Sequence, residues 1–313
     1  MEYIRAHWRG KHSLARSYWV NGVLLGFLVG AGILGLDYVL GKMWLGPGVI
    51  VVWILLLWSI TFVFSIWQLV GVWRCAGQHK VLTGRRFWAT LAQVAVVLGW
   101  IGLAKSSLNY GKVGWLAFEV AAELGPIDYR VELVDGDIHF SGDITYYSVE
   151  MVRELLSSSP DIDTLLINSP GGFTGPAMKL GSLVEQNGLT VIAVTQCESA
   201  CTMPLVASPR PTVIPGTIIG FHRAGGVGIP QVEEEAVTAL EEYYRAQGVD
   251  PEVIQRAIST PFENVWRPSL QQLALYGVVK YVFDTQTFEI VDAGDYCAAR
   301  PGDCWIAGAG SIR

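Results

Sequence analysis

One serine and one histidine in the second half of the sequence have the surroundings that nucleophilic catalysis requires. Ser199 lies in the run CESACT, between an apolar strand-like segment, 190–195, and a helix-like one. A serine at a strand-to-helix corner is exposed for attack, and the next backbone amide points to where an oxyanion forms. His222 ends a later strand-like segment, 217–222, and could act as the base for that serine. Ser199 and His222 are therefore a candidate catalytic dyad.

The remaining histidines are less suitable partners for Ser199. They are His7, His12, His79 and His139. The first three belong to the N-terminal part of the chain, which has a membrane-like composition, and the last lies in an early pair of strands. His222 instead follows the Ser199 helix in an alternating order of strands and helices. A serine and a histidine in one domain also occur together by chance, so the pair needs support from other motifs.

A glycine-rich turn offers a place for an anion. The run SPGG, residues 169–172, follows an apolar strand-like segment and precedes a helix that begins at about residue 175. Free backbone amides at such a turn and at a helix start can hold an anion. Any tight turn with positive φ also needs glycine, so Gly171 and Gly172 have a purely structural interpretation as well.

Strands and helices alternate around these residues. We predict strands at 129–134, 138–144, 164–168, 190–195 and 217–222, and helices at 146–157, 175–186, 230–247 and 250–259. The first two strands are expected to pair around an Asp-Gly turn. The alternation that follows predicts a mostly parallel sheet with covered faces.

The first third of the chain has the composition of a membrane region. Overall, 51% of residues are hydrophobic and 16% are charged, with a mean hydropathy of +0.37, which excludes a disordered chain and an ordinary soluble protein. Three apolar stretches, 18–40, 49–72 and 87–103, are of the length that crosses a hydrocarbon core of about 30 Å. The first lacks the small-residue cleavage site of a signal peptide, so we expect it to be retained.

The two parts of the chain carry opposite charges. Residues 1–106 have ten Lys or Arg and two Asp or Glu, a net charge of +8, whereas residues 107–313 have a net charge of −14. Clustered Lys and Arg precede the first span and fill the loop between the second and third, which predicts that both are cytoplasmic. An odd number of spans then places the acidic part outside. That part lacks the basic clusters that phosphate binding needs, so no nucleic acid partner is expected.

Four segments follow from these patterns. We predict a membrane region at 1–105, a linker near the membrane surface at 106–126, an α/β domain at 127–285 and a cysteine-containing tail at 286–313. Four of the five cysteines fall outside the cytoplasm in this arrangement, where disulfides persist.

The four cysteines form two closely spaced pairs. Cys297 and Cys304, in the run CAARPGDC, are predicted to form a small disulfide loop. For Cys197 and Cys201, a disulfide and two buried thiols are equal alternatives, since their spacing matches neither a zinc ribbon nor a CxxC redox pair. No metal site is expected from these residues.

Three motifs together resemble the Clp-type proteolytic subunit family, part of the crotonase-like superfamily that includes signal peptide peptidase A. They are INSPGG at 167–172, CESA at 197–200 and FH at 221–222, in the family's order and with its intervals. The resemblance covers 129–284 and includes the closing run YGVV. It implies an α/β domain of the ClpP/crotonase-like spiral type, here preceded by about three transmembrane α-helices.

The resemblance implies a role for each matched residue. Ser199 is expected to attack the acyl carbon, and His222 to take its proton and return it to the leaving amine. The backbone amides of Gly172 and Ala200, beside Gly171, are expected to form the oxyanion hole.

The sequence departs from the family at the third catalytic position. Val265 stands where the family has an aspartate that orients the histidine. Glu263 and Asn264 are adjacent and are the candidates for this role, because a carboxylate or an amide oxygen can orient an imidazole.

These observations predict a membrane-anchored serine peptidase in a bacterial inner membrane, with its active site on the periplasmic side. Its expected partners are peptides or exposed protein segments and the lipid bilayer. Family members also self-assemble, which implies a homo-oligomer, and no cofactor is expected. Two alternatives stay open: a catalytically inactive scaffold at the membrane, suggested by Val265, and an enzyme acting on coenzyme A thioesters, which the predicted location disfavours.

Overall fold

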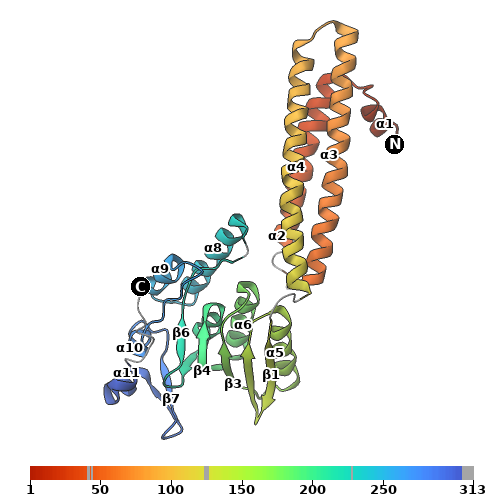
Figure 1. The fold of residues 1–313 in the computed structure, drawn as a ribbon. Helices are drawn as coiled ribbons and strands as arrows, with labels where there is room; N and C mark the ends of the chain where they lie inside the picture. The colour runs from red at the N-terminus through yellow and green to blue at the C-terminus, as the bar shows by residue number, and fades with distance from the viewer. Residues whose placement is uncertain (41–42, 44, 123–126, 227, 305–313) are drawn as a thin grey trace. The chain divides into compact units, whose positions relative to one another are not determined.

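The computed structural model describes residues 1–40, 43, 45–122, 127–226 and 228–304 (Figure 1). The chain divides into two compact units, Met1–Gly125 and Pro126–Arg313.

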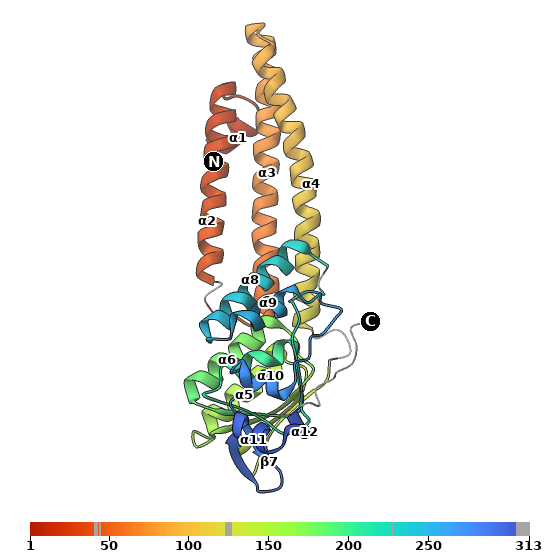
Figure 2. The ribbon, with the colours of Figure 1, turned by 90° about the vertical axis from the view of Figure 1, so that its left-hand side faces the viewer.

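Within the described residues, the regular elements of the first unit are all helices. Its elements are α1 (Glu2–Trp8), the π-helix η1 (Arg16–Leu24), α2 (Leu25–Leu40), α3 (Pro47–Thr83) and α4 (Phe87–Ala121). Figure 2 shows α2, α3 and α4 running alongside one another. Three helical stretches are long and apolar enough to cross a membrane, namely Arg16–Leu40, Pro47–Thr83 and Phe87–Ala121. The predicted three apolar helices before an α/β domain are therefore confirmed.

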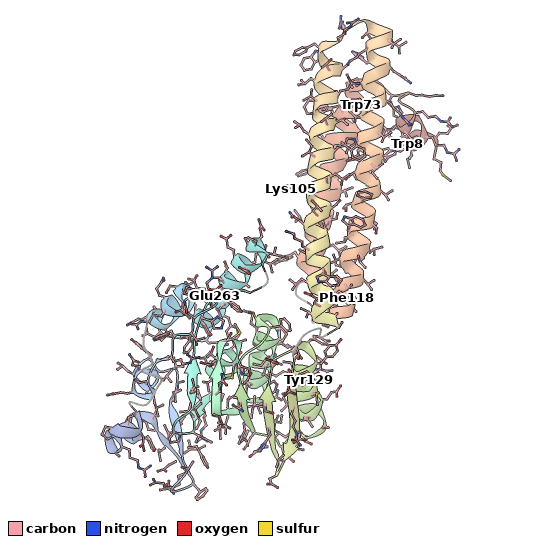
Figure 3. All side chains as sticks on the ribbon, viewed as in Figure 1. Trp8, Trp73, Lys105, Phe118, Tyr129 and Glu263 are labelled. Carbon is pink, nitrogen blue, oxygen red and sulfur yellow. A yellow bond between two sulfur atoms is a disulfide. The ribbon has the colours of Figure 1, made fainter. Side chains whose placement is uncertain are left out.

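The third long helix extends well beyond its predicted end. The predicted apolar stretch ends at residue 103 and the predicted linker covers 106–126, whereas α4 continues to Ala121. Lys105 lies part-way along this helix and Phe118 near its end (Figure 3). The 35 residues of α4 span about 52 Å, more than a hydrocarbon core of about 30 Å. Hydropathy therefore marked only the apolar part of the helix. Residues 123–126 lie outside the described residues.

The N-terminal helix packs against the C-terminal part of α3. The Arg74 guanidinium donates a hydrogen bond to the Trp8 carbonyl oxygen at 2.8 Å and lies over the Trp8 ring, and Gln78 Nε2 donates to the Arg9 carbonyl oxygen at 3.2 Å. The basic N-terminal segment and the basic end of α3 thus share one end of the helical unit.

A buried histidine anchors α1 within this unit. His7 is fully buried, and its Nδ1 lies 3.0 Å from Asn21 Nδ2 and 3.3 Å from Ser17 Oγ. Its ring occupies the space above Gly71, where an added Cβ would lie 2.1 Å from Nε2. Burial lowers the pKa of His7 from 6.5 to about 4, so the ring is neutral at pH 7.

The second unit is built on one eight-stranded sheet within the described residues. Its strands are β1 (Tyr129–Val134), β2 (Asp137–Gly142), β3 (Thr164–Ser169), β4 (Thr190–Glu198), β5 (Arg210–Val213), β6 (Ile218–Gly220), β7 (Tyr281–Asp284) and β8 (Glu289–Asp292). The order is β1-β2-β3-β4-β5-β7-β8, and β6 pairs with β4. The outer pairs β1-β2 and β7-β8 are antiparallel, and the other pairs are parallel.

Helices follow the strands in the expected alternation (Figure 1). They are α5 (Tyr146–Ser158), α6 (Thr174–Asn187), the 3-10 helix η2 (Ser199–Cys201), α7 (Thr202–Val206), α8 (Pro230–Ala246), α9 (Pro251–Ser259), α10 (Leu270–Leu275), α11 (Ala293–Ala299) and α12 (Pro301–Cys304). Apolar side chains of the strands and helices, including Leu165, Ile167 and Leu180, form a core that is closed to solvent. The α/β fold class is therefore confirmed.

The C-terminal part is more regular than the sequence indicated. The short strands β5, β7 and β8 and the helices α10, α11 and α12 were not predicted, because elements of four to seven residues carry little periodic signal. The predicted tail, 286–313, contains β8 and two helices up to Cys304, which is bonded to Cys297. Both cysteines are buried against the core of the second unit. Residues 305–313 lie outside the described residues.

Candidate active site

Two adjacent parallel strands bring Ser199 and His222 to the same edge of the sheet. Strand β6 pairs with the end of β4, so that Cys197 lies opposite Ile219 and Glu198 opposite Gly220. Ser199 directly follows β4, and His222 lies two residues after β6. Carboxyl ends of parallel strands are where binding and catalytic groups gather in α/β sheets.

Ser199 has the backbone conformation of a sharp strand-to-helix turn. Its φ is +55°, a value that non-glycine residues seldom adopt, and the 3-10 helix η2 begins there. Gly171 packs directly behind it: an added Cβ on Gly171 would lie 2.7 Å from Ser199 Cβ and 3.2 Å from the Ala200 nitrogen. The φ of Gly171 is +119°. The close approach of the two loops therefore requires glycine at position 171.

Two backbone amides beside Ser199 are available to an anion. In the β-bridge between Ile144 and Gly172, the Ile144 amide donates to the Gly171 carbonyl oxygen at 2.7 Å, and the Phe173 amide donates to the Ile144 carbonyl oxygen at 2.9 Å. The Gly172 amide takes no part in this bridge. Ala200 is the second residue of η2, where amides have no partner within the helix.

The amide of Gly171 is already engaged. It donates to Ser169 Oγ at 3.0 Å. Of the two glycines in the turn, Gly172 is therefore the one whose amide suits the expected oxyanion hole, and Gly171 provides the space for Ser199.

Contacts on the helical side hold the carbonyl of Ser199. Thr202 Oγ1 donates to the Ser199 carbonyl oxygen at 2.6 Å and lies 2.5 Å from the Tyr244 hydroxyl. Burial raises the pKa of Tyr244 well above its ordinary value, so its hydroxyl stays neutral. Of the two alternatives for Cys197 and Cys201, the structure has the disulfide: they are bonded to each other and closed to solvent.

His222 is oriented by a backbone carbonyl. Its Nδ1 lies 2.8 Å from the carbonyl oxygen of Arg223, and its ring packs edge-on against Phe262 with the ring centroids 5.2 Å apart. A carbonyl oxygen can only accept, so Nδ1 is the donor. In the neutral ring, Nε2 is then the unprotonated nitrogen, which is the form that a general base requires.

The predicted site residues are only partly brought together. Among the described residues, no hydrogen bond joins Ser199 to His222, and none joins His222 to Glu263 or Asn264. The latter two are exposed in the turn after α9, where Figure 3 shows Glu263. Val265 lies beside Gly220, at 2.5 Å from where a Cβ on that glycine would be.

A buried carboxylate next to the serine, that of Glu198, was not predicted from the sequence. Glu198 is 7% exposed and accepts hydrogen bonds from Arg267 Nε and from Gln196 Nε2, both at 2.5 Å. No spacing in the sequence connects residues 198 and 267; the only signal was an acidic residue at the end of an apolar strand. Among the described residues, no group of three or more His, Cys, Asp or Glu side chains is arranged to hold a metal ion.

Comparison with curated proteins gives distant similarities. No protein-family model matches the chain. It is 26% identical over 269 residues to lysine histidine transporter-like 4 and 24% identical over 267 residues to lysine histidine transporter-like 3, both from Arabidopsis thaliana. Each match covers 82% of this chain and 50% of the other protein. The chain thus spans about half the length of the curated relatives it matches.

Comparison with solved structures gives proteases among the similar chains. A serine-to-alanine mutant of the 1510-N membrane-bound stomatin-specific protease is 18% identical, with a TM-score of 0.37 over 46% of this chain and 76% of that one. A lysine-to-alanine mutant of the same protease, in complex with a substrate peptide, has a TM-score of 0.36. ClpP1 from Listeria monocytogenes is 19% identical, with a TM-score of 0.42 over 49% of this chain and 95% of that one.

Proposed function

We propose that the chain is a membrane-anchored serine peptidase with its active site outside the cytoplasm. The observation that carries this proposal is the turn at Ser199. A serine held at positive φ, near amides of Gly172 and Ala200 that have no hydrogen-bond acceptor among the described residues, is arranged for attack on a carbonyl and for binding the oxyanion that results.

The proposed mechanism is acyl transfer through Ser199. Its Oγ attacks the carbonyl carbon of the scissile peptide, while His222 Nε2 takes the hydroxyl proton and then gives it to the leaving amine. The carbonyl oxygen becomes an oxyanion held by the two amides. Water then repeats the sequence on the acyl-enzyme and releases the second product. The proton transfer needs His222 to approach Ser199, and such hydrogen bonds often tighten only when substrate is bound.

The orientation in the membrane is inferred from the positive charges. Arg74 contacts Trp8, so the basic N-terminal segment and the basic end of α3 lie at the same end of the helical unit. The excess of Lys and Arg favours the cytoplasm for that end. The chain leaves α4 at the opposite end, which supports an α/β unit outside the cytoplasm. A bacterial inner membrane with the unit in the periplasm fits this arrangement.

The expected substrates are peptides or exposed segments of proteins near the bilayer. The proposed mechanism uses only side chains and backbone amides of the chain itself and needs no cofactor. Self-assembly into a homo-oligomer, as the resemblance to Clp-type subunits implies, is part of the same proposal.

A second candidate function is an inactive scaffold that binds a partner at the membrane. Two observations favour it: Ser199 and His222 form no hydrogen bond among the described residues, and His222 is oriented by the carbonyl of Arg223 rather than by a carboxylate. Losing a charged orienter while keeping the geometry can lower turnover by about 10⁴.

Peptide cleavage separates the two candidates. The purified full chain in detergent is incubated with a mixed peptide library, and new termini are identified by mass spectrometry. A peptidase should cleave, and Ser199→Ala should lower the rate by at least about 10³-fold. Ser157→Ala, on the exposed face of α5, serves as the control and should cleave like the wild type. Absence of cleavage by the wild type, or equal cleavage by the Ser199→Ala variant, would contradict the proposal.

A further inference from the structure

We propose that the Cys197–Cys201 disulfide is a positioning element of the candidate active site, so that the peptidase reaches its full rate only when these two cysteines are oxidised. This inference rests on the proposed function, because it assigns a role to residues around the proposed nucleophile. It adds to that function a condition, the redox state of the compartment.

The disulfide encloses the residues that would do the chemistry. Its bond joins the end of β4 to the end of η2, and the loop that it closes contains Glu198, Ser199 and Ala200. The amide of Ala200, one of the two proposed oxyanion donors, therefore lies inside the loop. Both cysteines are closed to solvent within the core of the unit. The covalent link thus fixes the turn to the packed part of the sheet.

The other restraints act on one side of the turn or the other. Glu198 is held on the strand side by Arg267 and Gln196. The Ser199 carbonyl is held on the helix side by Thr202. Among the described residues, the disulfide is the one covalent bond between side chains that connects the two sides of the turn. Because Ser199 is held at a φ of +55°, which side chains disfavour, a turn freed of this link is expected to relax.

Relaxation of the turn would misplace the reacting groups. The amide of Ala200 has to point at the developing oxyanion, and Ser199 Oγ has to face His222. A displacement of about 1 Å at such a site can cost about 10²-fold in rate. The reduced enzyme is therefore expected to be folded but slow.

Closing the link is a thiol–disulfide exchange. The thiols of Cys197 and Cys201 lose two electrons and two protons and form one S–S bond, while a disulfide-bearing oxidant is reduced to two thiols. Reducing compartments such as the cytoplasm keep such pairs open, and oxidising ones let them close. The proposed peptidase would thus stay slow until its α/β unit has been exported.

The chain carries its own control for this proposal. The second disulfide, between Cys297 and Cys304, closes a loop in the C-terminal helices and encloses no residue of the candidate site. Its removal tests what a lost disulfide does to the unit in general. A role specific to the active site predicts different outcomes for the two pairs.

The test compares two double variants of the full chain in detergent. The first carries Cys197→Ala with Cys201→Ala, and the second carries Cys297→Ala with Cys304→Ala. Two quantities are measured: the rate at which a fluorophosphonate probe labels Ser199, and hydrogen exchange of the segment 197–203. The first variant should be labelled about 10- to 100-fold more slowly, with faster exchange confined to this segment. The second should be labelled within about twofold of the wild-type rate. Unchanged exchange in the sheet shows that both variants are folded.

Reduction of the wild type is the second arm. Dithiothreitol is applied until mass spectrometry shows the thiols of Cys197 and Cys201 free, and the labelling rate should then fall by the same factor. Oxidised glutathione should restore the labelling rate. The Cys297→Ala, Cys304→Ala variant should lose and regain its labelling rate in the same way as the wild type.

Equal labelling and equal exchange in the first variant and the wild type would overturn the proposal. Failure of the proposed function looks different, since the wild type itself would not be labelled. In that case hydrogen exchange tests the positioning role of the disulfide. Faster exchange of 197–203 in the first variant supports this role, and unchanged exchange rejects it.

Discussion

At the scale of single residues, the candidate site depends on backbone atoms as much as on side chains. A backbone carbonyl, that of Arg223, orients His222, and two backbone amides near Ser199 find no acceptor in the part of the chain that the structure describes. A carbonyl fixes the tautomer of an imidazole as a carboxylate does, but it carries no full charge to stabilise the imidazolium that forms during proton transfer. The proposed enzyme is therefore expected to be slower than one with a buried carboxylate.

Gly171 gives the most selective residue-scale prediction. In the Gly171→Ala variant, the new Cβ would approach Ser199 Cβ to 2.7 Å at a backbone φ of +119°. The turn must then shift, and labelling of Ser199 by a fluorophosphonate should fall by at least about 10²-fold. Gly175→Ala is the matched control, because nothing lies within 4 Å of its added Cβ. Equal labelling of the two variants would show that the contact between the loops is not needed.

Motifs in the sequence predict side chains of the site, but not its backbone contacts. The types and order of Ser199, His222 and the glycines were visible as motifs, and the structure places them at one sheet edge. The Arg223 carbonyl could not be predicted, since every residue has one. Neither could the contact of Glu198 with Arg267, because it joins residues far apart in the sequence. Glu263 and Asn264 were chosen by proximity in sequence, and they lie exposed in a turn instead.

At the scale of elements, an ion pair ties the C-terminal helices to the sheet. Asp284, at the end of β7, accepts a hydrogen bond from Arg300 Nη1 at 2.6 Å and one from the Gln286 amide at 2.9 Å. The Gln286 amide, followed by the Arg300 guanidinium, holds the pKa of this carboxyl below its ordinary value. The contribution of Asp284 to stability is therefore present above the ordinary carboxyl pKa and is lost as pH falls through the lowered one.

This pair predicts a pH-dependent effect of substitution. Asp284→Asn should lower the thermal unfolding midpoint of the full chain at pH 7, where the wild-type carboxylate is charged. The difference from the wild type should shrink as pH falls below about 4, because the carboxyl then takes up a proton first in the unfolded chain and, at lower pH, in the folded one. Asp161→Asn, in the exposed turn before β3, should show no such pH-dependent difference. A constant difference between pH 7 and pH 3 for Asp284→Asn would contradict this account.

A second element-scale prediction concerns α1 and its histidine. In Gly71→Ala, the new Cβ would overlap the ring of His7, so α1 should detach from α3 and residues 2–8 should exchange hydrogen faster. Gly77→Ala has nothing within 4 Å of its Cβ and should leave this exchange unchanged. Since burial lowers the pKa of His7 to about 4, docking of α1 should also weaken as pH falls from about 6.5 towards 4. Equal exchange in both variants would contradict the role of Gly71.

The elements themselves were predicted unevenly, for physical reasons. The helix α3 could be predicted because its apolar run is long, and α5 and α6 because their amphipathic periodicity repeats over several turns. Hydropathy does not distinguish the second half of α4 from a linker, since it reports the lipid-facing part and not the continuity of the helix. The four-residue strands β5, β7 and β8 are stabilised by their neighbours in the sheet, which a local pattern does not show.

At the scale of the whole molecule, the account depends on which side of the membrane holds the α/β unit. Basic residues cluster at one end of the helical unit, and the α/β unit is acidic. This asymmetry predicts that the C-terminal end of α3 lies in the cytoplasm and that the α/β unit lies on the other side of the membrane. The redox proposal and the proposed peptidase both require that arrangement.

Accessibility in sealed cells tests the orientation. A membrane-impermeant maleimide should react with the Phe288→Cys variant in intact cells, because this side chain is 77% exposed on the α/β unit. It should react with the Leu82→Cys variant, 81% exposed near the end of α3, only after permeabilisation. The native cysteines should not react with the maleimide, since Cys75 is buried and the other four form disulfides. The reverse pattern would place the site in the cytoplasm.

The central claim is that Ser199 is an activated nucleophile, and covalent labelling tests it most directly. Isolated membranes containing the full chain are treated with a fluorophosphonate, and the modified residue is mapped by tandem mass spectrometry. The account predicts a single adduct on Ser199, strongly slowed in His222→Ala and absent from Ser199→Ala. Absence of an adduct from the wild type, or an adduct that persists in Ser199→Ala, would contradict it.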